Sequence, residues 1–130
     1  MAGVPIYEKE PTMQEIVTRY IELWNETDPV ARRRGIDALY ADDARYTDPL
    51  IDASGREQID QVIAGAQAQF PGFVFRLAAP VDGHHDQVRF SWELGPAGAE
   101  APIAGFDVAV TDGNGRLQTV LGFLDRVPAS

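Results

Sequence analysis

The sequence contains no cysteine among its 130 residues. A disulfide framework, a thiolate nucleophile and a thiolate metal ligand are therefore excluded, and packing alone must hold the fold. Positive charge is also scarce, because eleven Lys and Arg stand against twenty Asp and Glu and give a formal net charge of −9 at pH 7. This balance opposes binding to nucleic-acid phosphates or anionic membrane surfaces, so we expect neither as a partner.

Long hydrophobic runs are absent as well. No stretch approaches the length of a membrane span, and the opening MAGVPIYEKEPT lacks the basic segment and apolar run of a signal peptide. We therefore expect a cytoplasmic protein. The length fits one domain over residues 1–130, in which residues 1–11 form a loose arm.

Helical periodicity appears first near the N-terminus. The motif TMQE is a capping box of Thr12 and Glu15, and the apolar spacing that follows predicts a helix over residues 13–25. The motif TDP predicts a second helix, capped by Thr27 or Asp28, that ends near YADDA. In SGRE the capping-box pattern of Ser and Glu recurs and predicts a third helix that ends at FPG.

Strand-like patterns appear in two places. The short segment ARYTDP, between the second and third helices, is predicted to be one strand, and after residue 73 runs rich in Val, Phe and Leu alternate with turn clusters. Four antiparallel strands in a meander are the economical interpretation. The sequence therefore predicts an α+β fold in which three N-terminal helices cover one face of a curved sheet.

The last predicted strand is apolar on both faces. Leu117, Leu121 and Phe123 alternate to one side, and Val120 and Leu124 to the other. Three helices suffice to cover one face only, so we expect the outer face to be buried against a second copy in a homodimer.

Asp107 is the most conspicuous candidate for chemistry, because the run PIAGFDVAV has no other charge. Desolvating a carboxylate is costly unless it is paired, hydrogen-bonded or kept neutral. Two interpretations stay open. Asp107 either pairs with a neighbour such as Arg89 or lies at an exposed edge, or it is an acid in an apolar pocket whose pKa is raised until it is neutral at pH 7.

Two further residues complete a candidate constellation. Asp48, in YTDPL, is either a turn residue before proline or a proton-accepting base at the mouth of a pocket. Tyr20 lies on the apolar face of the first helix, where it is either a core aromatic or a hydrogen-bond donor to a ligand oxygen. Two acids in unlike environments would have separated pKa values, which divides acid and base roles between them.

The remaining polar motifs are interpreted without a role in catalysis or cofactor binding. His84 and His85 in DGHHD alternate across a strand and fit a solvated hairpin tip, so we assign no metal. The run from Arg32 to Arg34 fits a solvated helix face. Glycine-rich segments lack the context of a phosphate loop, so no nucleotide cofactor is expected.

The order of elements and the three candidate residues resemble the nuclear-transport-factor-2-like superfamily, and within it the ketosteroid isomerase and SnoaL-like polyketide cyclase branches. The resemblance covers residues 13–126 and is carried by VTRYIELWNETD, LYADDARYTDPL, GREQI and FDVAVTDGNGRL. It implies a cone-shaped sheet that encloses an apolar pocket. It also implies that Tyr20 is an oxyanion-hole tyrosine, Asp48 the general base and Asp107 a protonated oxyanion-hole acid.

The function that the resemblance implies is cofactor-free proton transfer next to a carbonyl of a hydrophobic, steroid- or polyketide-like substrate. Aromatic residues are then expected to bind the substrate, namely Trp24, Tyr46, Phe75, Trp92 and Phe123. The segment PIAGFD departs from the isomerase pattern by two extra residues before the acid. Alternatives are a non-catalytic dimeric module that binds an apolar ligand or a protein, and an epoxide hydrolase in which Arg89 holds water between two acids.

Overall fold

The computed structural model describes residues 11–128. Its first two helices begin and are capped as the sequence predicts. Helix α1 spans Met13–Asn25 with a complete capping box, in which the backbone N–H of Glu15 donates to Thr12 Oγ1 at 3.1 Å and that of Thr12 donates to Glu15 Oε1 at 2.8 Å. Helix α2 spans Pro29–Leu39, and its N-cap Asp28 accepts a hydrogen bond from the backbone of Ala31.

The third helix, α3, spans Arg56–Gln69, but its predicted capping box is wrong. Its N-cap is Gly55, at φ 86°, and no side chain caps it. Ser54 is unavailable as a cap because it pairs with Arg45 across two strands, and its backbone N–H donates to the side chain of Gln58 at 2.8 Å.

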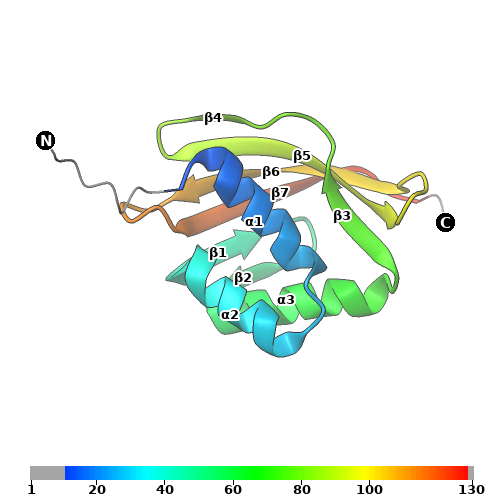
Figure 1. The fold of residues 1–130 in the computed structure, drawn as a ribbon, viewed down its shortest axis with the longest axis horizontal. Helices are drawn as coiled ribbons and strands as arrows, with labels where there is room; N and C mark the ends of the chain where they lie inside the picture. The colour runs from blue at the N-terminus through cyan, green and yellow to red at the C-terminus, as the bar shows by residue number, and fades with distance from the viewer. Residues whose placement is uncertain (1–10, 129–130) are drawn as a thin grey trace, which may run out of the picture.

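A curved, unclosed sheet of seven strands lies against these helices (Figure 1). Its spatial order is β2-β1-β7-β6-β5-β3, with β4 on the edge of β5. The strands are β1 Tyr40–Thr47, β2 Asp52–Ser54, β3 Phe73–Leu77, β4 Asp82–His84, β5 Gln87–Pro96, β6 Ile103–Thr111 and β7 Leu117–Arg126.

The α+β fold with three helices over one sheet is confirmed, and β3, β5, β6 and β7 form the predicted antiparallel meander. The sheet as a whole is mixed, because β1 pairs in parallel with β7. β1 also begins four residues earlier than ARYTDP, at Tyr40, and the short strands β2 and β4 were not predicted.

The core lies between the helices and the face of the sheet that they cover, which we call the inner face. Buried inner-face side chains from the sheet, including Val88, Phe90, Ala109 and Val120, meet the apolar faces of the helices. Leu117 belongs to this core as well, and its predicted place beside Leu121 is wrong. An irregularity in the β6–β7 pairing next to Thr111 changes the alternation of β7 at that point.

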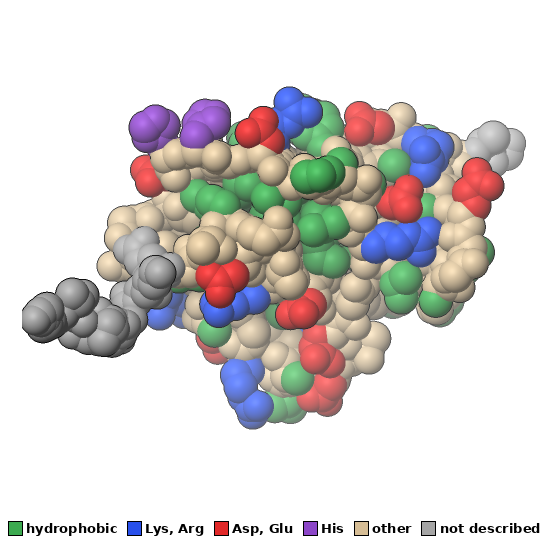
Figure 2. Space-filling view, turned by 45° about the horizontal axis from the view of Figure 1, so that its top comes forward, with side chains coloured by type: hydrophobic (Ala, Val, Ile, Leu, Met, Phe, Trp, Pro, Cys, Tyr) green, Lys and Arg blue, Asp and Glu red, His purple; other side chains and the backbone are tan. Residues whose placement is uncertain are grey.

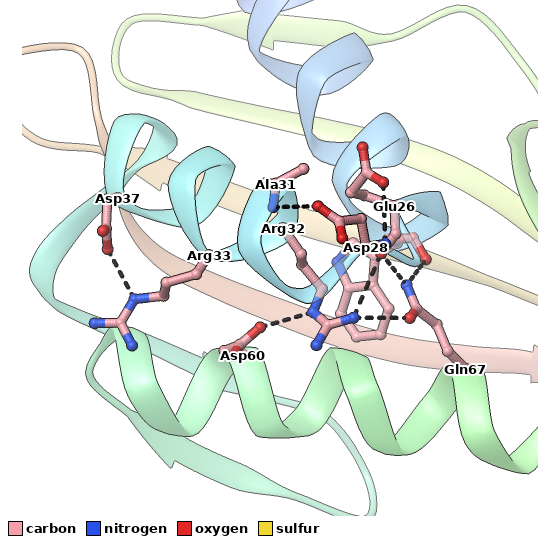
Figure 3. Close-up of polar contacts among 9 residues, drawn as sticks. Glu26, Asp28, Ala31, Arg32, Arg33, Asp37, Asp60 and Gln67 are labelled. Carbon is pink, nitrogen blue, oxygen red and sulfur yellow. Dashed lines mark hydrogen bonds and ion pairs between the residues drawn. The ribbon is translucent and has the colours of Figure 1, made fainter.

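The predicted solvated arginine run is corrected at Arg32, whose side chain is buried (Figure 3). Its Nε donates to Asp60 of α3 at 2.7 Å and its Nη1 donates to Gln67 at 3.0 Å. The Gln67 amide in turn donates to the carbonyls of Trp24 and Glu26 at the end of α1. Arg32 therefore ties the three helices together.

The face of the molecule in Figure 2 carries acidic and basic side chains interspersed. The two histidines lie exposed at the hairpin tip, as the sequence predicts, with His84 as the last residue of β4 and His85 in the turn after it. Within residues 11–128, no helix is long and apolar enough to cross a membrane. The N-terminal arm expected at residues 1–11 lies, apart from residue 11, outside the described residues.

The opposite, outer face of the sheet carries apolar side chains without a cover. Phe106 and Phe123 stack there with ring centroids 4.8 Å apart, and Leu121 lies exposed beside them. The homodimer expected through this face stays a prediction.

Candidate active site

A cavity of about 390 Å³ lies between the inner face of the sheet and helices α1 and α3. Its size is in the range of small-molecule sites. Tyr20 from α1, Asp48 from the end of β1 and Asp107 from β6 all line it. The three predicted catalytic residues, far apart in the sequence, therefore meet in one cavity.

Asp107 lies at the inner end of this constellation and is only 3% exposed. Tyr20 Oη lies 2.6 Å from its Oδ2, and Trp92 Nε1 donates to its Oδ1 at 3.0 Å. The pKa of Asp107 is raised to about 6. Burial is the main cause and the nearby Asp48 adds to it, whereas the two hydrogen bonds act in the opposite direction. The upward shift of this pKa is the one expected of an acid in an apolar pocket. A pKa of about 6 nevertheless leaves the carboxyl group mostly ionised at pH 7.

Two of the structural interpretations of Asp107, an ion pair with Arg89 and a place at an exposed edge, are wrong, whereas a hydrogen bond to a neighbouring strand is present through Trp92. β6 lies between β5 and β7, so the residue is not at an edge of the sheet. Arg89 pairs with Val108, one residue further along, and therefore points to the outer face, where its guanidinium lies 5.9 Å from the ring centre of Phe106. Arg89 is thus available neither as an ion-pair partner nor as a water-holding residue of an epoxide hydrolase.

Two glycines make the space that Asp107 and its neighbours occupy. A Cβ at Gly122 would lie 3.1 Å from Asp107 Oδ1 and 3.3 Å from Asp48 Cβ, so both acids approach the same point. A Cβ at Gly105 would lie 2.6 Å from the indole of Trp92. Gly105 belongs to PIAGFD, the segment that departs from the isomerase pattern.

Asp48 is the predicted turn residue, and its place also suits the base predicted for it. Its Oδ1 accepts hydrogen bonds from the backbone of Leu50 and Ile51, each at 2.9 Å, which makes it the turn residue before Pro49. Its Oδ2 accepts a hydrogen bond from Tyr46 Oη at 2.7 Å. The side chain is half-buried and borders the cavity, as a base at the mouth of a pocket should.

The tyrosines of the site are protonated donors. Burial raises the pKa of Tyr20 well above its usual value, and the negative charge of Asp107 raises it further. Burial and the two acids do the same to Tyr46. Tyr40, on the same strand, is also buried, and burial and the charge of Asp107 raise its pKa. The two acids are thus surrounded by hydroxyl groups.

The five residues expected to bind substrate all border the cavity, namely Trp24, Tyr46, Phe75, Trp92 and Phe123. Four of them form a chain of ring contacts, because Trp24 touches Tyr46 and Phe75, and Phe75 touches Trp92, with centroids 5.2–5.6 Å apart. Phe123 differs from the others because its ring stacks on Phe106 of the outer face.

The cavity opens beside the turn that Asp48 holds. Pro49, Leu50 and Ile51 all border the cavity, yet Leu50 is 82% exposed. A ligand would therefore enter past an apolar turn that is tethered to the candidate base.

The structure gives polar roles to two residues that sequence reasoning treated only as walls. Tyr46 donates to Asp48, and Trp92 donates to Asp107. Tyr46 precedes Asp48 by two residues, a spacing that puts both side chains on one face of a strand, so this contact was open to prediction. The Trp92 contact depends on the β5–β6 register, in which Phe90 lies opposite Asp107, and no local signal gives it. Within the described part of the chain, no group of three His, Asp or Glu is placed to hold a metal ion.

Comparison with known proteins agrees with this geometry. A family model described as the SnoaL-like domain matches residues 17–119. The chain belongs to the SnoaL-like family. The resemblance to the nuclear-transport-factor-2-like superfamily is thereby confirmed. Among curated proteins, no relative matches the sequence.

The solved structures similar to this SnoaL-like chain include both proposed enzymes and designed proteins. A proposed isomerase of the SnoaL-like family from Agrobacterium tumefaciens is 38% identical, with a TM-score of 0.81 over 85% of this chain and 94% of that one. A proposed polyketide cyclase from Sinorhizobium meliloti shares the fold at 16% identity and a TM-score of 0.66, over 82% and 92% of the two chains. A de novo designed protein with a curved β-sheet does so at 15% identity and a TM-score of 0.64, over 88% of each. The fold alone therefore does not fix a reaction.

Proposed function

We propose that this protein is a cofactor-free isomerase or cyclase that moves a proton next to a carbonyl group of a hydrophobic small molecule. The observation that carries the proposal is the meeting of Asp48, Tyr20 and Asp107 in one apolar cavity. The likeness to the proposed isomerase from Agrobacterium tumefaciens supports it.

In the proposed mechanism, Asp48 removes a proton from the carbon beside the carbonyl. The electron pair of that C–H bond forms a carbon–carbon double bond, and the carbonyl π pair moves to oxygen, which accepts a hydrogen bond from Tyr20. In an isomerisation, Asp48 returns the proton to a different carbon and the enzyme is unchanged. In a cyclisation, the enolate carbon attacks a second carbonyl of the same molecule and forms a carbon–carbon bond, while the π pair of that carbonyl moves to its oxygen. The first carbonyl forms again, and the new alkoxide takes the proton back from Asp48, so the enzyme is unchanged.

The lining of the cavity favours an uncharged substrate. Asp48 and Asp107 are its charged residues, and no Lys, Arg or His is among the described residues that border it. A substrate that carries a carboxylate or phosphate would meet two acids without a compensating cation. A neutral, apolar, polycyclic ketone fits the aromatic walls instead.

Deuterium exchange into a probe ketone tests this proposal without knowledge of the natural substrate. We expect the protein to accelerate exchange of the protons beside the carbonyl of 2-tetralone in D2O, followed by proton NMR. Asp48→Asn is expected to reduce this acceleration by about 100-fold or more, because it removes the base. Asp42→Asn removes an exposed acid of the same strand and is expected to leave the rate unchanged. Equal rates in the Asp48 and Asp42 variants would refute the assignment of the base.

A non-catalytic ligand-binding module is the second candidate. It is favoured by one observation, namely that Asp48 and Asp107 have hydrogen-bond partners within the protein on all four carboxylate oxygens. Binding of 2-tetralone with no acceleration of exchange at any pH between 5 and 8 would select this candidate.

We also propose that a second copy of the chain covers the outer face of the sheet. The exposed apolar residues Leu121 and Phe123 lie close to a charged group in which Glu93 contacts Arg76 and Arg126. An apolar centre with a polar rim is typical of protein interfaces. A molar mass of two chains in light scattering is expected at micromolar concentration, and a single-chain mass would overturn the proposal.

A further inference from the structure

The indole N–H of Trp92 makes a hydrogen bond whose role the proposed function does not explain. It donates to Asp107 Oδ1 at 3.0 Å, while the other oxygen of the same carboxyl group, Oδ2, lies 2.6 Å from Tyr20 Oη. An indole N–H donates and never accepts a hydrogen bond. Oδ1 must therefore act as an acceptor toward Trp92 whether Asp107 is ionised or neutral.

This constraint decides where a proton can sit on Asp107. A proton on Oδ1 would face the N–H of Trp92, so the neutral acid must carry its proton on Oδ2. From Oδ2 the proton is donated to Tyr20 Oη, because that oxygen lies within hydrogen-bond distance. The hydroxyl hydrogen of Tyr20 is then free to turn to a ligand in the cavity. When Asp107 is ionised, Tyr20 donates to Oδ2 instead and has no hydrogen to offer a ligand.

We propose that Trp92 is a positioning residue that fixes the proton of Asp107 on Oδ2, so that Tyr20 alone donates to the substrate oxygen, and does so when Asp107 is neutral. The inference deepens the proposed function and rests on it for the identity of that oxygen. It replaces the expected arrangement, in which Tyr20 and Asp107 both donate directly to the substrate.

The backbone supports this assignment independently. Gly105 lies opposite Trp92 in the β5–β6 pairing, and a Cβ there would come within 2.6 Å of the indole ring and closer still to the backbone oxygen of Phe123. A side chain at this position would therefore collide both with β7 and with the indole whose N–H reaches Asp107. Gly105 precedes Asp107 by two residues, on the same face of β6, so one strand supplies both the acid and the space for its donor.

The groups that face Asp107 make it the titrating member of the arrangement. Tyr20 from α1, Tyr40 and Tyr46 from β1, and Asp48 after β1 are the titratable groups that act on it, and none of them is a cation. The raised pKa values of the tyrosines keep them protonated in the pH range in which Asp107 gains or loses its proton.

Nitrogen–proton NMR of the indole groups tests the proposal on the wild-type protein and requires no substrate. The chain holds two tryptophans, so two indole N–H signals are expected. Trp92→Phe assigns them, because it removes one signal. We expect the Trp92 signal to move with the titration of Asp107 near pH 6, and the Trp24 signal to move several-fold less, because Trp24 is not one of the two side chains, Tyr20 and Trp92, that bond to the Asp107 carboxyl group. Equal movement of the two signals, or none, would overturn the proposal.

Titration of the Asp107 carboxyl carbon in matched variants supplies the second readout. Trp92→Phe keeps an aromatic ring but loses the donor to the carboxylate, so we expect the pKa of Asp107 to rise by about one pH unit. Trp24→Phe removes the other indole from the same cavity and is expected to leave that pKa where it is. An unchanged pKa in Trp92→Phe would refute the positioning role even if the protein catalyses ketone exchange, so a failure here and a failure of the proposed function are distinguishable.

Discussion

Replacing Asp107 by asparagine should make the protein more stable at neutral pH. In the unfolded chain this carboxyl group has a pKa near 3.8, and in the folded protein its pKa is about 6. Between these values the folded state holds a proton that the unfolded state has lost. The free energy of unfolding therefore falls as the pH rises through this window, by 1.36 kcal/mol for each pH unit.

Over the roughly two pH units of the window, the wild-type protein loses about 3 kcal/mol of stability that it would keep with a neutral residue. Asparagine does not ionise. Its amide oxygen can still accept from Trp92, and its amide nitrogen can donate to Tyr20, in the geometry that the neutral acid uses. Asp107→Asn therefore imitates the protonated acid at every pH.

Urea unfolding followed by tryptophan fluorescence at pH 4 and pH 7 measures this effect. The advantage of Asp107→Asn over the wild type is expected to be larger at pH 7 than at pH 4 by about 2.4 kcal/mol, because at pH 4 the unfolded wild-type chain is already partly ionised. Asp42→Asn, at an exposed position, is the matched control and should stay within about 0.5 kcal/mol of the wild type at both values. A difference between Asp107→Asn and the wild type that does not change with pH would refute the assignment of a raised pKa.

Three further changes test the fold that supports the site. Arg32→Met leaves the half-buried carboxylate of Asp60 without its cation and should lower the free energy of unfolding by about 3 kcal/mol. Arg33→Met, at an exposed ion pair, should lower it by less than about 0.5 kcal/mol. Thr12→Ala removes the cap of the helix that carries Tyr20 and should cost about 1 kcal/mol, against a smaller change for Thr18→Ala within the same helix. Phe123→Glu places charge on the outer face and should convert the proposed dimer to a single-chain mass in light scattering; a two-chain mass in this variant would place the interface elsewhere.

Local sequence patterns predicted the elements that local interactions determine. The bounds of α1 follow from the reciprocal bonds of Thr12 and Glu15 and from helical spacing, both of which span a few residues. The same pattern failed at Ser54, because that residue is drawn into β2 by its pairing with Arg45. The parallel pairing of β1 with β7 joins segments about seventy residues apart and has no local signature.

The candidate site, too, could be predicted only in part from the sequence. A lone acid in an apolar strand was enough to single out Asp107, a turn before proline and an apolar helix face pointed to Asp48 and Tyr20, and the resemblance to a family assigned the three their roles. The partners of Asp107 depend on strand register, which places Arg89 on the outer face and brings Trp92 within reach. The burial of Arg32 could not be predicted from the sequence either, because its partners lie on a different helix.

The central claim is that Asp48 acts as the base while a neutral Asp107 frees the Tyr20 hydroxyl in the same cavity, and the pH dependence of ketone exchange tests it most directly. We predict that exchange of the 2-tetralone protons, catalysed by the wild-type protein, falls as the pH rises above about 6, because Asp107 loses the proton that frees the Tyr20 hydroxyl. In Asp107→Asn the exchange rate should stay level over the same range. A parallel fall in both proteins, or a level profile in the wild type, would contradict the account.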